Sequence, residues 1–506
     1  SQFYVFSGLY MNKKKSEAMW LGSKKNCTDT FFDFVWKKQL KILGVYFSND
    51  KCASMVAENW TNRLENVKRL IVVWEKRNLS IIGKICIVKT FLLSQFVYVM
   101  QALVVPDKVL TELNCLLFRF LWRKKDCNRR AFEKVKRTVV CNNFENGGLN
   151  MIDVRQMQVS FLLQWVVRCC NAQPHEKWSV LPTFLFSHLG LNNACFYSNV
   201  KSSTFRGFEY VKSFFWRTVL KTWLDNNRHN TDDSVCTLLW NNVNVMYAGN
   251  VLFFPDWIAG GYMHVNDVTD LNGFYSYKDI CAVLGNSPSR ILEYTAVRAA
   301  VARFIAKFSC NVAKGKAEDF PLFNNKRLLK SREFRQELVA MKSSQPCSVG
   351  FWKRKFNIEI DDSYWAIANN STCEVRLLVL HWKILHNIYP TNILLCKMKV
   401  RENNKCFYCN DIVDVVEHFF FHCPVIKKFW LEVEQFIRIY VEANIKLGVS
   451  DVLFGITHFS TISKDKLKKI NHIILIAKMC VSIFKKTESV YSPMTIFERQ
   501  LALRKV

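Results

Sequence analysis

A short array of cysteine and histidine residues near the C-terminus constrains this chain more than any other feature of its sequence. Cys406, Cys409, His418 and Cys423 form the pattern C-x2-C-x8-H-x4-C. The first two cysteines can clamp a metal ion from a tight turn, and the histidine and last cysteine can complete a tetrahedral shell from the start of a helix. Zinc favours such nitrogen and sulfur ligands, and a shell filled by protein ligands is structural rather than catalytic. The array therefore predicts a closed structural zinc site.

The sequence alone leaves alternatives to this zinc site and to its ligands. His422 is a competing ligand, but we prefer Cys423 because a thiolate binds zinc strongly. A decayed or coincidental set of cysteines is the alternative to a metal site. A zinc hydrolase is disfavoured, since it needs an open water position and the chain has no H-E-x-x-H helix. The thiolates would leave negative charge on the site, and the nearby Lys405, Lys427 and Lys428 could offset it or could equally bind phosphate.

The composition favours a folded chain that meets polyanions. The chain has 506 residues, of which 50% are hydrophobic, so it can bury the cores of several domains. Lysine and arginine total 71 against 42 acidic residues, a net charge of +29 that attracts nucleic acid, with a membrane surface as the rival anion. The 19 cysteines are odd in number and no signal peptide opens the chain, which predicts mostly free thiols in a reducing compartment.

The pattern of apolar residues in the sequence predicts a mainly α fold. Alternating apolar residues on both sides of Gly44 predict a β-hairpin, and helical periodicity begins near Trp60. Ser80 can cap a second helix that ends by Pro106, where a third helix starts. The apolar run of the second helix, 81–105, is interrupted by lysine and glutamine, so we expect a buried helix and no membrane span. Helices continue over 151–400, 430–441 and 464–486.

Basic residues predict a surface for nucleic acid. The segment 123–137 is rich in lysine and arginine, which predicts phosphate binding, with a nuclear-import signal as a weaker alternative. Basic residues on the helices before it could grip phosphates or form an ordinary exposed face. The predicted nucleic-acid-binding residues are Lys15, Lys84, Lys89, Arg123, Lys124, Lys125, Arg129, Arg130, Lys134, Lys136 and Arg137.

Several segments, in their order, resemble the reverse transcriptase of LINE-type (non-LTR) retrotransposons after its active-site strand. The segments are Ser7-Gly8-Leu9 with Asn12 and Lys15-Ser16; Leu43-Gly44-Val45; Trp74, Arg77, Leu79-Ser80, Gly83-Lys84 and Val88-Lys89; Phe120-Leu121-Trp122; Gly147-Gly148-Leu149; His381-Trp382-Lys383 with Leu385-His386 and Pro390-Thr391; and the array 406–423. No single segment is specific, and the stretch 171–343 contributes least. We expect His381 and His386 to be core residues whose ring nitrogens are hydrogen-bonded.

The resemblance implies both an organisation and a function. It implies the end of a palm at 1–58, a helical thumb at 59–140, a helical linker at 141–400, a CCHC zinc knuckle at 401–431 and a C-terminal helical region at 432–506. It also implies binding of an RNA template, of RNA–DNA hybrid and of DNA during target-primed reverse transcription. Such work is nuclear, with a possible cytoplasmic ribonucleoprotein stage. Structural zinc is the expected cofactor, and magnesium is expected only in the palm.

The polymerase carboxylates of that family are not in this sequence. The resemblance places the Tyr/Phe-x-Asp-Asp strand turn before Ser1, and the endonuclease further upstream. The pairs Asp232-Asp233 and Asp361-Asp362 lack an apolar strand, and helix N-termini explain them. We therefore assign no catalytic residue and expect a fragment, inactive alone, whose partner is the missing N-terminal portion. The alternative is a free-standing, co-opted or relic zinc-containing RNA-binding or interaction protein without enzymatic activity.

Overall fold

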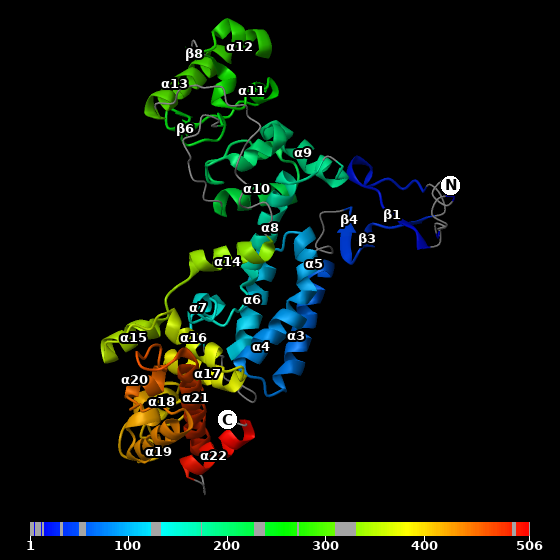
Figure 1. Cartoon of the computed structure of the whole chain (residues 1–506). Coiled ribbons are helices and arrows are strands. Elements are labelled where there is room, and N and C mark those ends of the chain that lie inside the picture. Colours follow the sequence, from blue (N-terminus) through cyan, green and yellow to red (C-terminus); the bar gives the residue numbers. More distant parts are fainter. Residues whose placement is uncertain are drawn as a thin grey trace. The chain divides into compact units, whose positions relative to one another are not determined.

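A computed structural model shows a mainly helical chain with short strand pairs, as the sequence predicts (Figure 1). It describes residues 5, 12, 15–30, 34–49, 57–122, 133–173, 175–226, 238–270, 273–308, 330–487 and 492–504. The described residues form two compact units. Unit 1 comprises Ser1–Phe96, Asp107–Asp153 and Val339–Val506, and unit 2 comprises Val97–Pro106 and Val154–Leu338. The domain boundaries expected from the sequence stay predictions.

Unit 1 contains the predicted hairpin. Strands β3 (Gln39–Ile42) and β4 (Val45–Ser48) pair antiparallel, with Ile42 opposite Val45. The two turn residues, Leu43 and Gly44, both have positive φ, which is the geometry of a tight two-residue hairpin turn. Buried Asn59 then pairs with the backbone of Tyr46, accepting from its N–H at 3.0 Å and donating to its carbonyl at 2.8 Å. The hairpin is thereby fixed to the helix that follows it. A further strand pair, β1 (Glu17–Ala18) and β2 (Val35–Trp36), is parallel.

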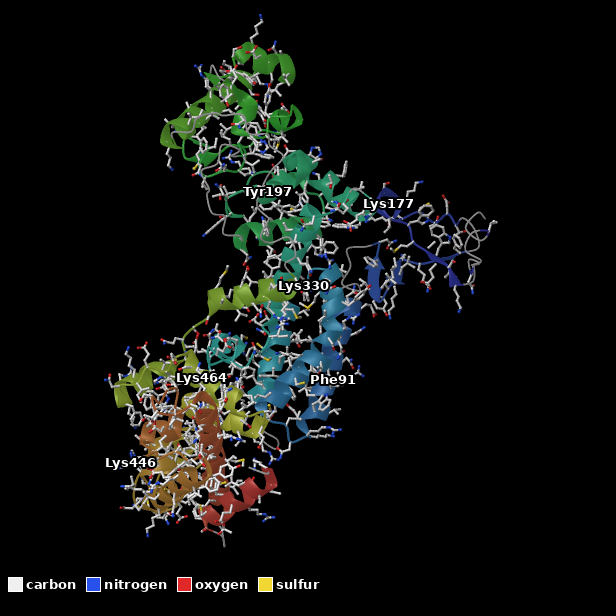
Figure 2. The ribbon with its side chains drawn as sticks, in the orientation of Figure 1. Phe91, Lys177, Tyr197, Lys330, Lys446 and Lys464 are labelled. Atoms are coloured by element: carbon white, nitrogen blue, oxygen red, sulfur yellow. The ribbon has the colours of Figure 1, made fainter. Side chains whose placement is uncertain are left out.

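The helices after the hairpin follow the predicted order. They are α3 (Asn62–Glu75), α4 (Ile81–Ile87), the π-turn η4 (Val88–Leu92), α5 (Ser94–Ala102) and α6 (Asp107–Trp122). The Ser80 hydroxyl caps α4 by accepting from the N–H of Gly83 at 3.0 Å, and Pro106 directly precedes α6. The expected second helix is thus broken at the π-turn rather than continuous. Phe91, which is labelled in Figure 2, belongs to this turn, and its side chain is exposed.

The apolar run over these helices is largely buried within the protein. Ile85, Val88, Leu92 and Phe96 are all buried, as expected for a core helix. Among the residues that the structure describes, no single helix is long and apolar enough to cross a membrane. One pair of helices, Ile81–Leu92 and Ser94–Ala102, is together long and apolar enough for a span by length and composition alone, but the two helices are bent by 48° at the break between them.

Unit 2 is built on helices with aromatic cores and two short strand pairs. Its helices include α8 (Val154–Cys170), α9 (Val180–Phe186), α10 (Phe214–Asn226), α11 (Pro255–Ala259), α12 (Tyr277–Leu284), α13 (Arg290–Phe308) and the start of α14 (Ser331–Lys342). The strand pairs are β5 (Met246–Tyr247) with β6 (Asn250–Val251), and β7 (Thr269–Asp270) with β8 (Gly273–Phe274). One core gathers Trp216 and Trp223, and the other gathers Trp240 and Trp257. The aromatic stripes of this region therefore serve packing.

The C-terminal part of unit 1 is a group of helices, drawn from yellow to red in Figure 1. They are α15 (Cys347–Phe356), α16 (Asp362–Ser371), α17 (Val375–Leu385), α18 (Asn392–Lys397), α19 (Pro424–Tyr440), α20 (Val449–Phe454), α21 (Lys464–Thr487) and α22 (Pro493–Arg504). Asp361 caps α16, as its helix-start pattern predicts, by accepting from the N–H of Ser363 and Tyr364. The pair Asp232-Asp233 lies outside the described residues.

The turn at Gly147 and Gly148 joins segments of unit 1 that are distant in sequence. The Gly147 carbonyl accepts from Trp382 Nε1 at 2.9 Å and from His386 Nε2 at 2.7 Å. Gly147 has φ of 73°. A Cβ on Gly148 would stand 1.9 Å from the Asn142 carbonyl oxygen, so only glycine fits there. Burial lowers the pKa of His386 to about 4, which keeps its ring neutral in this contact.

A lysine is buried in the core of these C-terminal helices. Lys478 of α21 is fully buried, and its Nζ lies 3.1 Å from His381 Nδ1 of α17 and 3.3 Å from the Leu453 carbonyl of α20. His381 Nε2 faces the Tyr364 carbonyl at 3.3 Å, so the ring donates there and accepts from the lysine. His381 and His386 are thus both core residues with hydrogen-bonded ring nitrogens, as expected. Desolvation lowers the pKa of Lys478 to about 7.

Replacing Gly148 by alanine tests the glycine turn. The added Cβ would overlap the Asn142 carbonyl, and backbone cannot move aside as a side chain can. We expect Gly148→Ala to lower the free energy of unfolding of unit 1 by about 3 kcal/mol. Gly350→Ala is the control, because its Cβ would meet only Arg354 at 3.6 Å. Thermal unfolding measures both, and an equal melting temperature for the two variants would contradict the steric argument.

Replacing Lys478 by methionine tests the buried amine. Its pKa is about 7 when folded and about 10.5 when unfolded, so the unfolded chain binds more protons between these values. This group therefore makes stability rise with pH above about 7, and the rise is complete near the unfolded pKa. We expect wild type to gain about 1 kcal/mol per pH unit relative to Lys478→Met over this range. Urea unfolding at several pH values measures it, with Lys469→Met, an exposed lysine of the same helix, as control. Parallel pH profiles for wild type and Lys478→Met would refute the assignment.

Candidate metal centre

The four residues of the sequence array converge in the structure. The ligand atoms of Cys406, Cys409, His418 and Cys423 all lie within 4.8 Å of one another. Cys406, His418 and Cys423 are buried and Cys409 is half-buried. His422 is exposed and is not part of the cluster, so the geometry agrees with the preference for Cys423. Within the described part of the chain, this is the group of such side chains arranged to hold a metal ion.

The first pair of cysteines is held by a tight backbone turn. The N–H of Cys406 donates to the Ile412 carbonyl at 2.7 Å, and the N–H of Asn410 donates to the Cys406 carbonyl at 3.0 Å. Asn410 adopts φ of 53°, a left-handed conformation that asparagine tolerates. The N–H of Tyr408 points at Cys406 Sγ from 3.4 Å. Backbone donors therefore face the sulfur on which a thiolate charge would reside.

The second pair is brought together by a π-turn. The π-turn η11 spans His418–His422, and the N–H of Cys423 donates to the His418 carbonyl at 3.0 Å. This hydrogen bond spans five positions, which places His418 and Cys423 on one side of the turn. Cys423 then occupies the N-cap position of α19, whose first residue is Pro424. Proline is suited to this first helical position because it has no N–H to leave unpaired.

The donor set fits a tetrahedral zinc ion. Bonds of about 2.3 Å to sulfur and about 2.0 Å to nitrogen would separate the two atoms by about 3.5 Å in a tetrahedron. Cys409 Sγ and His418 Nε2 lie 3.4 Å apart. The histidine thus presents Nε2 to the site. Three sulfurs and one imidazole nitrogen match the closed N/S shell of structural zinc.

The thiols of this cluster influence one another. Cys406 donates a hydrogen bond to Cys423, which raises the pKa of Cys406 and lowers the pKa of Cys423. Burial lowers the pKa of His418, so its ring is neutral and able to ligate. A metal ion would take the place of the shared proton, because cysteine ligates as the thiolate.

Two side chains beside the cluster were not singled out from the sequence. The Asp414 carboxylate is fully buried and accepts from the N–H of Asn392 at 2.6 Å. Lys485 of α21 lies 3.4 Å from the same carboxylate oxygen. Asp414 stands between the two pairs of ligands in the sequence, and that position was its only signal. Lys485 is distant in the sequence, so no local pattern indicates it.

Most residues of the predicted basic segment lie outside the described part of the chain. Arg123, Lys124, Lys125, Arg129 and Arg130 are among them, as is Ser7-Gly8-Leu9. Of the remainder, Lys136 is exposed, and Lys134 and Arg137 are half-buried. Arg137 pairs with Glu133 at 2.6 Å and lies over the Phe118 ring at 4.8 Å.

The predicted residues earlier in the chain have different surroundings. Lys15 and Lys89 are exposed. Lys84 is half-buried, donates to the Phe120 carbonyl at 3.0 Å, and has a pKa that burial lowers. Arg63, a further basic residue in α3, donates to the carbonyls of Gln95 and Gly44. Lys84 and Arg63 thus have structural partners inside the protein, and phosphate binding by Lys15, Lys84, Lys89, Lys134, Lys136 and Arg137 stays a prediction.

Replacing ligands one at a time tests the metal centre. Loss of a direct ligand should weaken zinc binding by more than the roughly 10–100-fold that outer contacts contribute, so we expect Cys423→Ser to do so. His422→Gln is the matched control and should leave affinity unchanged, since His422 lies outside the cluster. Chelator competition under reducing conditions measures the zinc affinity. The reverse ranking of the two variants would move the fourth ligand to His422.

A comparison with known protein families identifies part of this region. Residues 349–430 match the family described as zinc-binding in reverse transcriptase. The match contains all four residues of the metal cluster and the helices α16 and α17 that precede it. Together, the match and the cluster show that this part of the chain is a zinc-binding region related to that of reverse transcriptases, with a candidate metal site at 406–423.

Proposed function

We propose that this chain is the C-terminal portion of a LINE-type reverse transcriptase and that it holds RNA and RNA–DNA hybrid for a polymerase palm. The observation that carries the proposal is the match at 349–430, which contains a cluster with the geometry of a zinc site. The ordered landmarks before that segment, from the hairpin at Gly44 to the glycine turn at Gly147, support the LINE type. Target-primed synthesis at a genomic nick, and hence a nuclear location with a cytoplasmic ribonucleoprotein stage, belong to the same proposal.

Zinc in this proposal is a structural ion. Cys406, Cys409, His418 and Cys423 would hold it, and it would supply cross-links between the turn at 406–409 and the start of α19. Few buried apolar residues lie in that turn, so those cross-links would add to its stability. Magnesium would belong to the palm of the polymerase, where carboxylates hold the ions for phosphoryl transfer.

Charge and exposure support nucleic acid as the partner. The net charge of +29 favours encounter with polyanions. Lys405, Lys427 and Lys428 flank the metal cluster in sequence and are exposed. Contacts from such lysines to phosphate give affinity and register rather than base recognition.

A salt titration of RNA binding tests this function. We expect the logarithm of the association constant for a labelled single-stranded RNA to fall linearly with the logarithm of salt concentration. The double variant Lys427→Ala/Lys428→Ala should reduce the slope by about 1.4, since each contact contributes about 0.7 with single strands. Arg438→Ala, an exposed residue toward the other end of α19, is the control.

Fluorescence anisotropy of the zinc-loaded full chain measures the affinities, with RNA, RNA–DNA hybrid and duplex DNA compared in the same series. Binding that is absent at low salt, or independent of salt, would contradict the proposal. A slope that the lysine variants leave unchanged would move the phosphate contacts elsewhere on the chain.

A further inference from the structure

Helix α21 lies outside the segment that matches the zinc-binding family, yet it contacts the turn that carries the first cysteines. The Tyr408 hydroxyl, between Cys406 and Cys409, donates to the Val481 carbonyl of α21 at 2.6 Å. The Tyr408 ring stacks on Phe484 of α21 with centroids 5.2 Å apart and planes 15° apart. The cysteine turn is therefore packed on α21 by both an apolar and a polar contact.

Lys485 of α21 reaches further into the same region. Its side chain is only 13% exposed. Its Nζ lies 3.3 Å from the Pro390 carbonyl, 3.5 Å from Asn392 Oδ1 and 3.4 Å from Asp414 Oδ2. It also lies 4.9 Å from the centre of the Phe419 ring, which follows the ligand His418. These contacts hold the ammonium group beside Asp414 and the Phe419 ring, next to the segments that carry the ligands.

Negative charge would gather around the cluster when it holds zinc. A zinc ion with three thiolates and a neutral imidazole carries one net negative charge, and fully buried Asp414 adds another. Glu417, also buried, has its own partner in Lys355. Lys405, Lys427 and Lys428 are exposed and screened by water. Arg401 is exposed too, and reaches Asn392 Oδ1 at 3.2 Å.

We propose that Lys485 is a positioning residue of the metal centre: its buried ammonium offsets the charge of the thiolates and Asp414, and α21 is part of the metal-binding unit. Asp414, 3.4 Å away, opposes the fall in the pKa of Lys485 that burial causes. With the site's charge compensated from within, the exposed lysines around it remain available for phosphate. The proposal rests on zinc binding by the cluster.

Variants of the full chain test this role. Lys485→Met removes the charge and keeps an unbranched apolar stem of similar reach, whereas Lys485→Arg keeps the charge. We expect Lys485→Met to weaken zinc binding by about 10–100-fold, as outer contacts to metal ligands do, and Lys485→Arg to retain most of the affinity. Lys469→Met, an exposed lysine on the same helix, should bind zinc as wild type does. Chelator competition gives affinity, and the Co²⁺–thiolate absorption bands report the ligand geometry.

A double variant separates two roles of the lysine. If Lys485 served only to neutralise Asp414, then Asp414→Asn/Lys485→Met would regain wild-type zinc affinity. If it also offsets the thiolates, the double variant will bind zinc more weakly than Asp414→Asn alone. Lys485→Gln serves as a second uncharged variant if Lys485→Met fails to fold, as judged by circular dichroism.

The outcomes distinguish this inference from the proposed function. No zinc bound by the wild-type chain would end both proposals. Zinc bound by wild type with equal affinity in Lys485→Met or Lys485→Gln, or affinity fully restored in the double variant, would overturn the role of Lys485 alone. Loss of thermal stability by the same amount with and without zinc would likewise show that the lysine supports the fold and not the metal.

Discussion

The C-terminal part of unit 1 depends on the convergence of four ligand atoms from two short segments. One segment is a tight turn, and the other is a π-turn at the start of α19. Neither has a long run of regular hydrogen bonds, so neither is stable alone. Binding energy from a structural metal is folding energy in such a case. A bound metal ion would cross-link the cysteine turn to the start of α19, whose own apolar face, including Phe429 and Trp430, is buried.

The surroundings of that cluster show how the desolvation cost of buried polar groups is offset by their hydrogen-bond partners. Asp414 is inaccessible to water, and its cost is offset by the Asn392 N–H and the Lys485 ammonium. Lys478 is equally buried but lacks a carboxylate partner among its described contacts, and the neutral His381 ring receives it instead. The Asp414–Lys485 contact keeps both charges, whereas the surroundings of Lys478 favour the neutral amine. One helix, α21, therefore supplies two lysines with opposite electrostatic roles.

The sequence predicted those features whose cause is local. The ligand spacing of 406–423, the hairpin at Gly44 and the Ser80 cap each follow from residues a few positions apart, and the structure contains them. The broken second helix was missed, since no proline or glycine marks the π-turn at 88–92. Contacts between distant residues could not be predicted. Lys84 is a basic residue of the kind that binds phosphate, but in the structure it donates to the Phe120 carbonyl. No pattern in the sequence indicated that Lys485 contacts Asp414.

The carbonyl of Gly147 has a consequence for how the protein is made. Its two donors, Trp382 and His386, follow it by 235 and 239 residues. At about 5–20 residues per second, a ribosome needs roughly 12–50 s to synthesise that interval. During this time the apolar surface that α17 later covers is exposed on the nascent chain. Such long-range pairing also slows folding, and apolar surface that stays exposed during synthesis is prone to aggregation.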